Sequence, residues 1–219
     1  MIHPPRLPKP FPATESELFL PHAHIFQSVM SGEDYNNLHA PGLIIEQVKA
    51  RKLQMLRTNL PGLRIVDSIL DTCEFSGSEW EKGFFRRVVF QGCRLMGTQM
   101  LDGIFEDVEF INCQMESATL VSSKFKRCRF SKCVLRKAVF DGADVSGVYF
   151  TDCDLTEANF HQAKLIGADL RTSQIGGLRI GVDEIRGAII APHQTLQVIG
   201  LLGVQVKDIA PPEDSFSDN

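Results

Sequence analysis

The sequence lacks the marks of a membrane-spanning, secreted or metal-dependent protein. It has no apolar run of about 18 residues, so we expect no transmembrane helix. The first residues, Met1 to Pro8, carry no apolar core of a signal peptide. No Cys-x2-Cys or similar ligand spacing occurs, so neither a metal nor a cofactor is expected. Phosphate loops, G-x-S-x-G and H-E-x-x-H are also missing, so we expect no enzyme.

Strong net charge is missing too, and the cysteines do not look like a disulfide framework. The 219 residues carry a formal net charge of −4, which favours neither direct nucleic-acid binding nor a strongly acidic decoy. All six cysteines recur at one position of a repeat described below, as small buried apolar residues do. Reduced thiols fit a cytoplasmic location. His22 and His24 are too few for a metal site, which needs three or four ligands.

What the sequence does contain is a large apolar residue at every fifth position from Leu60 to Ile190. This period fits neither an α-helix nor a flat strand. A second series, two residues earlier, is mostly small and runs from Cys73 to Ser173. Each five-residue unit therefore points one large and one small side chain inward. Because so short an element cannot bury this pair alone, the units are expected to stack as a solenoid.

The charges indicate twenty residues per coil. Residues twenty apart often have opposite signs, as in Asp67, Arg87, Asp107 and Arg127, and stacked opposite charges stabilise a ladder. The same step aligns two phenylalanine columns and one cysteine column. The columns are Phe90, Phe110, Phe130, Phe150; Phe85, Phe105, Phe125; and Cys73, Cys93, Cys113, Cys133, Cys153. Twenty residues make four units, which predicts a tube of square section.

These units resemble the pentapeptide repeat, whose consensus is Ala-Asp/Asn-Leu-x-x. The closest matches begin at Ala143, Ala158 and Ala168, and the resemblance covers about 130 of the 219 residues. It implies an all-β solenoid, a right-handed quadrilateral β-helix, with a short C-terminal capping helix. We expect an arm or cap over 1–37, the β-helix over 38–190, a cap over 191–210 and a disordered tail over 211–219. The arm is expected to cover the open first coil.

The C-terminal cap also predicts a homodimer. Pro192 lies early in an expected helix, and Gly203 can end it. Leu196, Ile199 and Leu202 form an apolar stripe on this helix. A short strand is expected at 204–206. The resemblance implies that such a cap closes the core and supports a twofold dimer, so these three residues are the expected dimer interface.

The resemblance further implies a binding protein that imitates duplex DNA. Quinolone-resistance and gyrase-inhibiting members of the family use an acidic dimeric rod to engage type II topoisomerases. By this resemblance, the chain modulates DNA gyrase or protects it from quinolones or toxins. The expected contacts are acids outside the paired rows: Asp102, Asp141 and Asp154.

Two alternatives remain open. In the first, the chain is a structural scaffold for an unknown protein partner. Its docking site would be the apolar pair Leu101 and Val121 or a basic belt over 124–137. In the second, this belt binds nucleic acid, although acidic coils flank it and no aromatic platform interleaves it.

Overall fold

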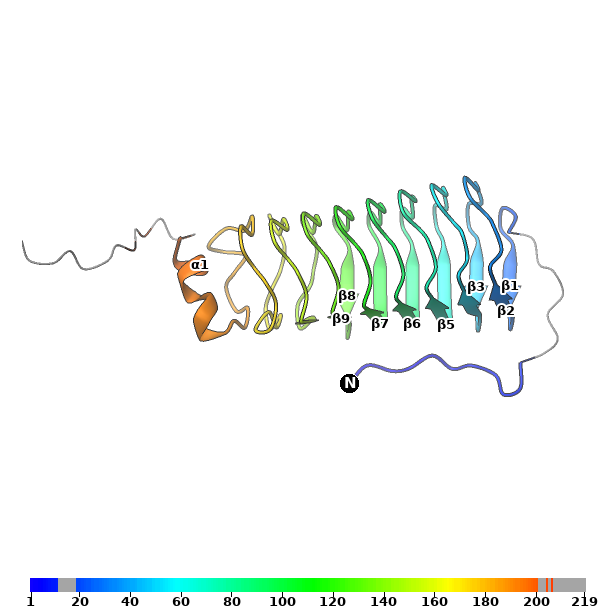
Figure 1. Cartoon of the computed structure of the whole chain (residues 1–219), viewed down its shortest axis with the longest axis horizontal. Helices are drawn as coiled ribbons and strands as arrows, with labels where there is room; N and C mark the ends of the chain where they lie inside the picture. Colours follow the sequence, from blue (N-terminus) through cyan, green and yellow to red (C-terminus); the bar gives the residue numbers. More distant parts are fainter. Residues whose placement is uncertain (12–18, 201–203, 205, 207–219) are drawn as a thin grey trace, which may run out of the picture.

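The chain is wound into a rod of stacked coils (Figure 1). The computed structural model describes residues 1–11, 19–200, 204 and 206. Within these residues ten parallel strands form one sheet, and a 3-10 turn and a short helix follow them. The elements are β1 His24–Phe26, β2 Val29–Ser31, β3 Ile44–Glu46, β4 Lys49–Arg51, β5 Arg64–Asp71, β6 Phe84–Gln91, β7 Ile104–Ile111, β8 Lys124–Lys126, β9 Arg129–Ser131, β10 Tyr149–Thr151, η1 Pro192–Gln194 and α1 Thr195–Ile199.

The predicted register of twenty residues per coil is confirmed. Ile65 of β5 pairs with Phe85 of β6, which pairs with Phe105 of β7. Outside the named strands, single residues form parallel bridges with the same twenty-residue step, as between Val139 and Asn159. The chain is a right-handed square β-helix, and neighbours in space are one coil apart in sequence.

A left-handed backbone residue follows most large core residues by two positions and turns the chain at a corner. Asp67, Asp102 and Arg127 are examples, with φ of 50°, 53° and 56°. This conformation costs a non-glycine residue roughly 1–2 kcal/mol. Hydrogen bonds between coils offset the cost, since corner amides donate to the next coil, as Lys82 N does to the Leu101 carbonyl at 2.8 Å. The corners also point their side chains outward.

The core consists of the two predicted phenylalanine columns and their neighbours. Phe90, Phe110, Phe130 and Phe150 stack in sequence, with ring centroids 4.8–5.1 Å apart and planes within 7°. Phe85, Phe105 and Phe125 stack similarly, at 4.7 and 4.6 Å. Phe110 therefore lies between Phe90 and Phe130, as the spacing predicts.

Side chains at the small inward position also donate hydrogen bonds to backbone carbonyls of the preceding coil. The Cys93 thiol donates to the Leu70 carbonyl at 3.2 Å, and the Ser78 and Thr98 hydroxyls make the equivalent bonds, to Met55 at 2.8 Å and to Phe75 at 3.0 Å. Each donor reaches a carbonyl twenty-three residues earlier. All six cysteines are free and buried, and burial raises the pKa of the Cys128 thiol to about 12. Cysteine, serine and threonine suit this slot because each is small and can donate.

Part of the predicted charge ladder forms ion pairs. Arg87 binds Asp67 with two hydrogen bonds, at 2.6 and 2.5 Å, and Arg127 binds Asp107 with two of 2.7 Å. Glu74–Arg94 at 3.6 Å, Glu106–Lys126 at 3.9 Å and Lys137–Glu157 at 4.0 Å are looser. Arg136 departs from the prediction, because it contacts Asp154 at 3.5 Å rather than the expected Glu116.

The coils begin earlier than the expected boundary at residue 38. β1 and β2 lie inside the segment assigned to the arm, yet they pair with β3 and β4 in the twenty-residue register. Ile25 and Met30 fill the large inward position and are 2% and 4% exposed. The repeat is hard to see here because its small position holds residues such as Ser28 and Glu33.

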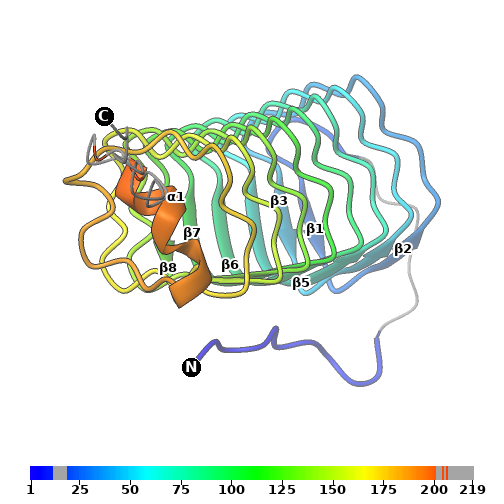
Figure 2. The same ribbon diagram turned by 60° about the vertical axis from the view of Figure 1, so that its left-hand side comes forward.

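The N-terminal segment has two separate roles. Phe19 is buried at the first coil and stacks on Tyr35, with ring centroids 4.2 Å apart. Residues 1–11 instead run along the side of the rod, beneath β5 and its neighbours in Figure 2. Sequence analysis did not predict this second contact.

At the other end, η1 and α1 lie against the last coil (Figure 2), and the side chain of Gln194 closes the core. The buried Gln194 amide donates to the Leu170 and Ser173 carbonyls, at 2.9 and 2.7 Å. Its carbonyl accepts from Ala191 N at 2.7 Å. α1 is only five residues long and ends at Ile199. Val204 and Val206 of the expected strand at 204–206 are described and neither lies in a strand, whereas Leu202, residue 205 and the expected tail lie outside the described residues.

Candidate protein-docking surface

We define the four sides of the tube by their buried columns. The first side contains Phe85 and Phe105, the second Phe90 and Phe110, the third Leu95 and Met115, and the fourth Trp80, Met100, Leu120, Phe140 and Phe160. The outward residues of the fourth side form a continuous bridge ladder: Asn59, Glu79, Gln99, Thr119, Val139, Asn159 and Arg179. This side is therefore flat and regular along the rod.

The fourth side is unusual in its lack of positive charge. Across its central coils, at 99–102, 119–122 and 139–142, there is no Lys or Arg. Asp102 is exposed and Asp141 half-buried at the corner that follows this side. Neither makes an ion pair among the described residues. The structure therefore places two of the three expected contact residues on one edge, with their carboxylates available to a partner.

Asp154 does not belong with them. It lies on the third side, where it bridges to Val134 and Gln174. Its carboxylate accepts from Thr156 N at 3.0 Å and contacts Arg136 at 3.5 Å. Burial opposes its ionisation, but these partners prevail and hold the pKa of Asp154 below its ordinary value. The expectation that Asp154 is an unpaired acid is wrong, because the sequence could not show a partner eighteen residues away.

The apolar pair Leu101 and Val121 does lie on the acidic edge. The Val121 carbonyl accepts from Asp102 N at 3.0 Å, so these residues occupy successive coils, and both side chains are half-buried. Beyond them Asp141, Asn159, His161 and Arg179 line an open depression. We call residues 99–102, 119–122 and 139–142 the acidic face. It combines two free carboxylates with a small apolar strip.

Elsewhere the surface charge alternates from coil to coil. Residues 101–120 hold five carboxylates and no Lys or Arg, 121–140 hold seven Lys or Arg and no carboxylate, and 141–160 again hold five carboxylates and no Lys or Arg. Lys126, Arg127, Arg136 and Lys137 of this basic belt each contact a carboxylate of a neighbouring coil. Arg129 lies over the Tyr149 ring at 5.7 Å. The belt is thus largely neutralised, which disfavours it as a nucleic-acid site.

The expected dimer residues are partly in view. Leu196 of α1 is 65% exposed and Ile199 is half-buried, whereas Val198 packs against the core. The core-facing residues of the cap are therefore Gln194 and Val198, which the apolar stripe did not identify. In the sequence, Gln194 looks like a surface residue, because a single glutamine after an apolar column belongs to no repeating pattern. The dimer interface stays a prediction.

No chemical centre is apparent in the described residues. They contain no cluster of three or more His, Cys, Asp or Glu side chains that could hold a metal ion. In the same residues no helix is long and apolar enough to cross a bilayer. What the surface offers is a long, regular side suited to binding.

Comparison with family models finds a match within the coils of the rod. The family model described as a pentapeptide repeat region matches residues 103–180. No curated protein matches the chain. Similar solved structures include a trypsin-treated form of QnrB1, a plasmid-mediated fluoroquinolone resistance protein. It is 13% identical, with 84% of this chain and 99% of that chain covered and a TM-score of 0.41.

HetL, a pentapeptide repeat protein involved in heterocyst differentiation regulation in the cyanobacterium Nostoc sp. strain PCC 7120, is 16% identical. Here 77% of this chain and 90% of HetL are covered, with a TM-score of 0.34. Rfr23, from the cyanobacterium Cyanothece 51142, is 14% identical over 65% of this chain and 90% of that one, with a TM-score of 0.31. The matched region, residues 103–180, is similar to a pentapeptide repeat region, and the same twenty-residue register continues on its N-terminal side through β1 to β6.

Proposed function

We propose that this chain is a non-catalytic binding protein whose acidic face docks a protein partner. The observation that carries the proposal is the cation-free stretch of the fourth side, where Asp102 and Asp141 flank Leu101 and Val121. Most other charges in the central coils have partners within the rod. A protein surface usually combines a small apolar contact with charges that steer the partner, and this face offers both.

The specific partner that we propose is a type II topoisomerase, DNA gyrase, with modulation of the enzyme or its protection from quinolones or toxins as the result. The rod shape and the free carboxylates support this. The alternation of acidic and basic coils limits the part of the rod that can imitate the phosphates of DNA. Duplex DNA carries about one charge per 1.7 Å, hence about three per coil of roughly 4.8 Å. A coil with seven Lys or Arg interrupts any such row, so only the acidic face can substitute for phosphates.

A gyrase supercoiling assay tests the partner directly. We expect the purified chain at micromolar concentration either to inhibit supercoiling or to restore it in the presence of a fluoroquinolone. Asp102→Lys combined with Asp141→Lys should remove that effect, because the partner's positive surface would then face like charge.

The matched control is Asp152→Lys with Asp144→Lys, which changes the net charge by the same amount outside the acidic face. The proposal of gyrase as partner fails if the wild type has no effect. The acidic face is the wrong contact if the control pair abolishes the effect and the acidic-face pair does not.

A second candidate is a scaffold that docks a different protein. The ion pairs between neighbouring coils favour this scaffold function, because they stabilise the sides of the rod without leaving a row of free carboxylates that would imitate DNA. Leu101→Glu with Val121→Glu would then impair the scaffold's assembly with its partner, while the gyrase assay would remain silent for wild type and variant alike.

A further inference from the structure

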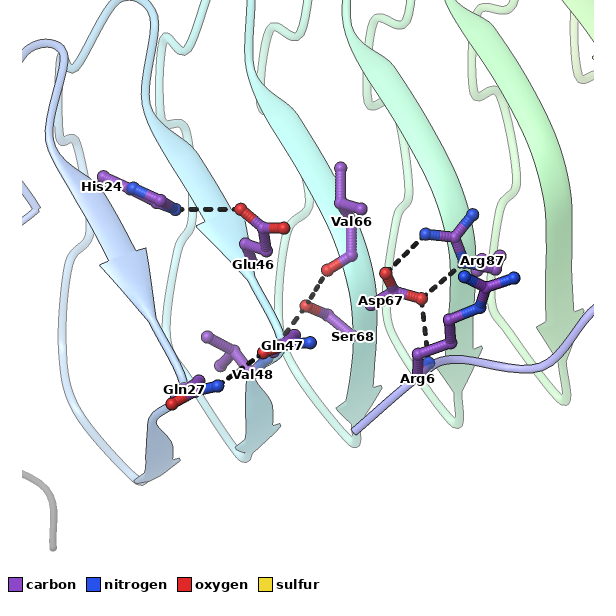
Figure 3. Close-up of polar contacts among 10 residues, drawn as sticks. All are labelled: Arg6, His24, Gln27, Glu46, Gln47, Val48, Val66, Asp67, Ser68 and Arg87. Atoms are coloured by element: carbon purple, nitrogen blue, oxygen red, sulfur yellow. Dashed lines mark hydrogen bonds and ion pairs between the residues drawn. The ribbon is translucent and has the colours of Figure 1, made fainter. Parts of the chain in front are cut away.

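The N-terminal arm, residues 1–8, is attached to the rod by its backbone. The amide of His3 donates to Asp107 Oδ1 at 3.1 Å, and the amide of Arg6 donates to Asp67 Oδ1 at 2.8 Å. Figure 3 shows the second contact, with Arg6 approaching the Asp67 carboxylate beside Arg87. The arm then bends at Lys9 and Pro10, and the Phe11 ring lies 5.0 Å from Lys49 Nζ.

The two acceptors belong to a corner column with a repeat of two coils. Along it the residues are Asp67, Arg87, Asp107 and Arg127, and each arginine binds the aspartate one coil earlier. Carboxylates that can accept from outside therefore appear at every second coil. Strand spacing makes that repeat about 9.6 Å, as twice roughly 4.8 Å.

The arm has a matching repeat of its own. Its donors His3 and Arg6 are separated by Pro4 and Pro5, which have no amide hydrogen and favour the polyproline II conformation. Three residues of polyproline II advance about 9.3 Å, at about 3.1 Å each, which is close to two coils. Successive donors therefore meet successive carboxylates.

Burial follows the same period. Ile2, Pro5 and Pro8, three residues apart, are half-buried, whereas His3, Pro4 and Arg6 are exposed. A polyproline II helix has three residues per turn, so one of its three edges lies against the rod. Leu7 is also half-buried. The amides of His3 and Arg6 make the hydrogen bonds, and the His3 ring adds a looser contact, with Nδ1 3.9 Å from Asp107 Oδ1.

The Asp67 and Asp107 carboxylates are well prepared for this contact. Both residues are nearly buried, at 4% and 5% exposure, and each is held by a two-bond arginine contact. A carboxylate fixed in this way keeps a lone pair directed outward, and an amide hydrogen bond to a charged acceptor is stronger than a neutral one.

We propose that this corner of the rod is a recognition site for proline-rich segments of the form X-Pro-Pro-X in polyproline II conformation, with residues 1–8 as its resident ligand. The X positions supply the amides for the two carboxylates, and the prolines set the distance between them. The site is separate from the acidic face and does not depend on the partner proposed for it. While the arm is bound, it excludes any competing proline-rich segment.

The test uses the full-length chain and a labelled synthetic peptide of residues 1–11. His3→Pro with Arg6→Pro removes both donors yet keeps the arm extended, so the arm should leave and the site should open. We expect the peptide to bind this variant saturably, at least about tenfold more tightly than the wild type. A control peptide of residues 1–11 that carries His3→Pro and Arg6→Pro lacks both amide donors and should bind neither protein.

The matched control is His3→Ala with Arg6→Ala, which keeps both amide donors and removes the two side chains, including the loose contact of the His3 ring with Asp107 at 3.9 Å. It should exclude the peptide as the wild type does. The proposal is overturned if the proline variant binds no peptide, or if the alanine variant binds it equally well. Hydrogen exchange on the wild type provides an independent measurement, because the amides of His3 and Arg6 should exchange more slowly than those of Ile2 and Leu7. Equal rates would contradict the docking itself.

Discussion

At the scale of single residues, the corner positions decide what the surface can do. Their left-handed backbone turns the side chain outward and leaves it between two coils. Asp67 and Asp107 use this position to bind an arginine of the next coil and an amide of the arm at once. Asp102, in the same conformation at another corner, has neither partner in the described residues. The same backbone conformation therefore places Asp67 and Asp107 in hydrogen bonds with the rod and the arm, but leaves the carboxylate of Asp102 exposed.

The first prediction concerns the pH dependence of the arm. Burial opposes ionisation of Asp67, but Arg87 and the Arg6 amide prevail. Arg127 and the His3 amide likewise lower the pKa of Asp107 below the ordinary 3.8. Because these folded-state pKa values are depressed, their stabilisation is complete above pH 3.8 and is lost as the pH falls through the lowered values.

Hydrogen-exchange protection of the His3 and Arg6 amides should therefore persist at neutral pH and vanish in acid while the coils remain folded. Asp107→Asn should weaken the protection of His3 even at neutral pH. Asp102→Asn, at a corner the arm does not reach, should leave it unchanged. Protection factors that stay unchanged while the pH falls from 7 to below both lowered pKa values, with the coils still folded, would contradict the role of the two carboxylates.

At the scale of elements, the stacked columns hold the coils together. Most of the strands are three residues long and cannot persist alone, so their order depends on the rings above and below. Phe110 is fully buried between two parallel rings, whereas Phe84 lies half-buried on the outer surface under Arg64.

We expect Phe110→Ala to lower the free energy of unfolding by about 3–5 kcal/mol, because it leaves a cavity in the column. Phe84→Ala, which removes the same atoms from the outer surface, should cost much less. Denaturant unfolding followed by circular dichroism measures both. Similar midpoints for the two variants would show that the column is not the core.

The cap helix carries the oligomerisation prediction. Leu196 and Ile199 lie on the described part of the cap, and Leu196 is largely exposed. If they form a twofold contact, Leu196→Asp with Ile199→Asp should halve the mass found by light scattering. Gln197→Asp, also on α1 and exposed, is the control and should not. A monomeric wild type would exclude the dimer and leave the capping role of Gln194 intact.

The sequence was sufficient for elements that repeat and insufficient for those that occur once. The five-residue period predicted the coil, both phenylalanine columns, the cysteine column and the Asp67–Arg87 and Asp107–Arg127 pairs. Because side chains of one type recur at one spacing, these features leave a pattern. Gln194 leaves none, and the partner of Asp154 breaks the twenty-residue rule.

The arm was missed for a different reason. Its contacts use backbone amides, which every residue except proline has, so side-chain chemistry gives no signal. The signal that was available is the pair Pro4 and Pro5 between two donors, set against aspartates two coils apart. The early coil containing β1 and β2 was missed because the small position there holds atypical residues.

At the scale of the whole molecule, charge is organised by coil rather than by side. Coils rich in carboxylate alternate with coils rich in Lys or Arg, and neighbours neutralise one another. The acidic face is the exception, since Lys and Arg are missing there from three successive coils. This combination gives a stiff rod with one distinctive side, which suits docking better than imitation of a uniformly charged duplex.

The twenty-residue stack can be tested most directly by cross-linking on the fourth side. Thr119→Cys with Val139→Cys places two thiols on directly bridged residues, within the separation that a disulfide spans. Thr119→Cys with Val134→Cys is the control, since residue 134 lies on the third side. The native thiols are buried and should not compete. We predict that mild oxidation links the 119–139 pair nearly completely, with little linkage of 119–134, as judged by intact mass and non-reducing gels. Preferential linkage of 119–134, or of neither pair in the folded protein, would contradict a coil of twenty residues.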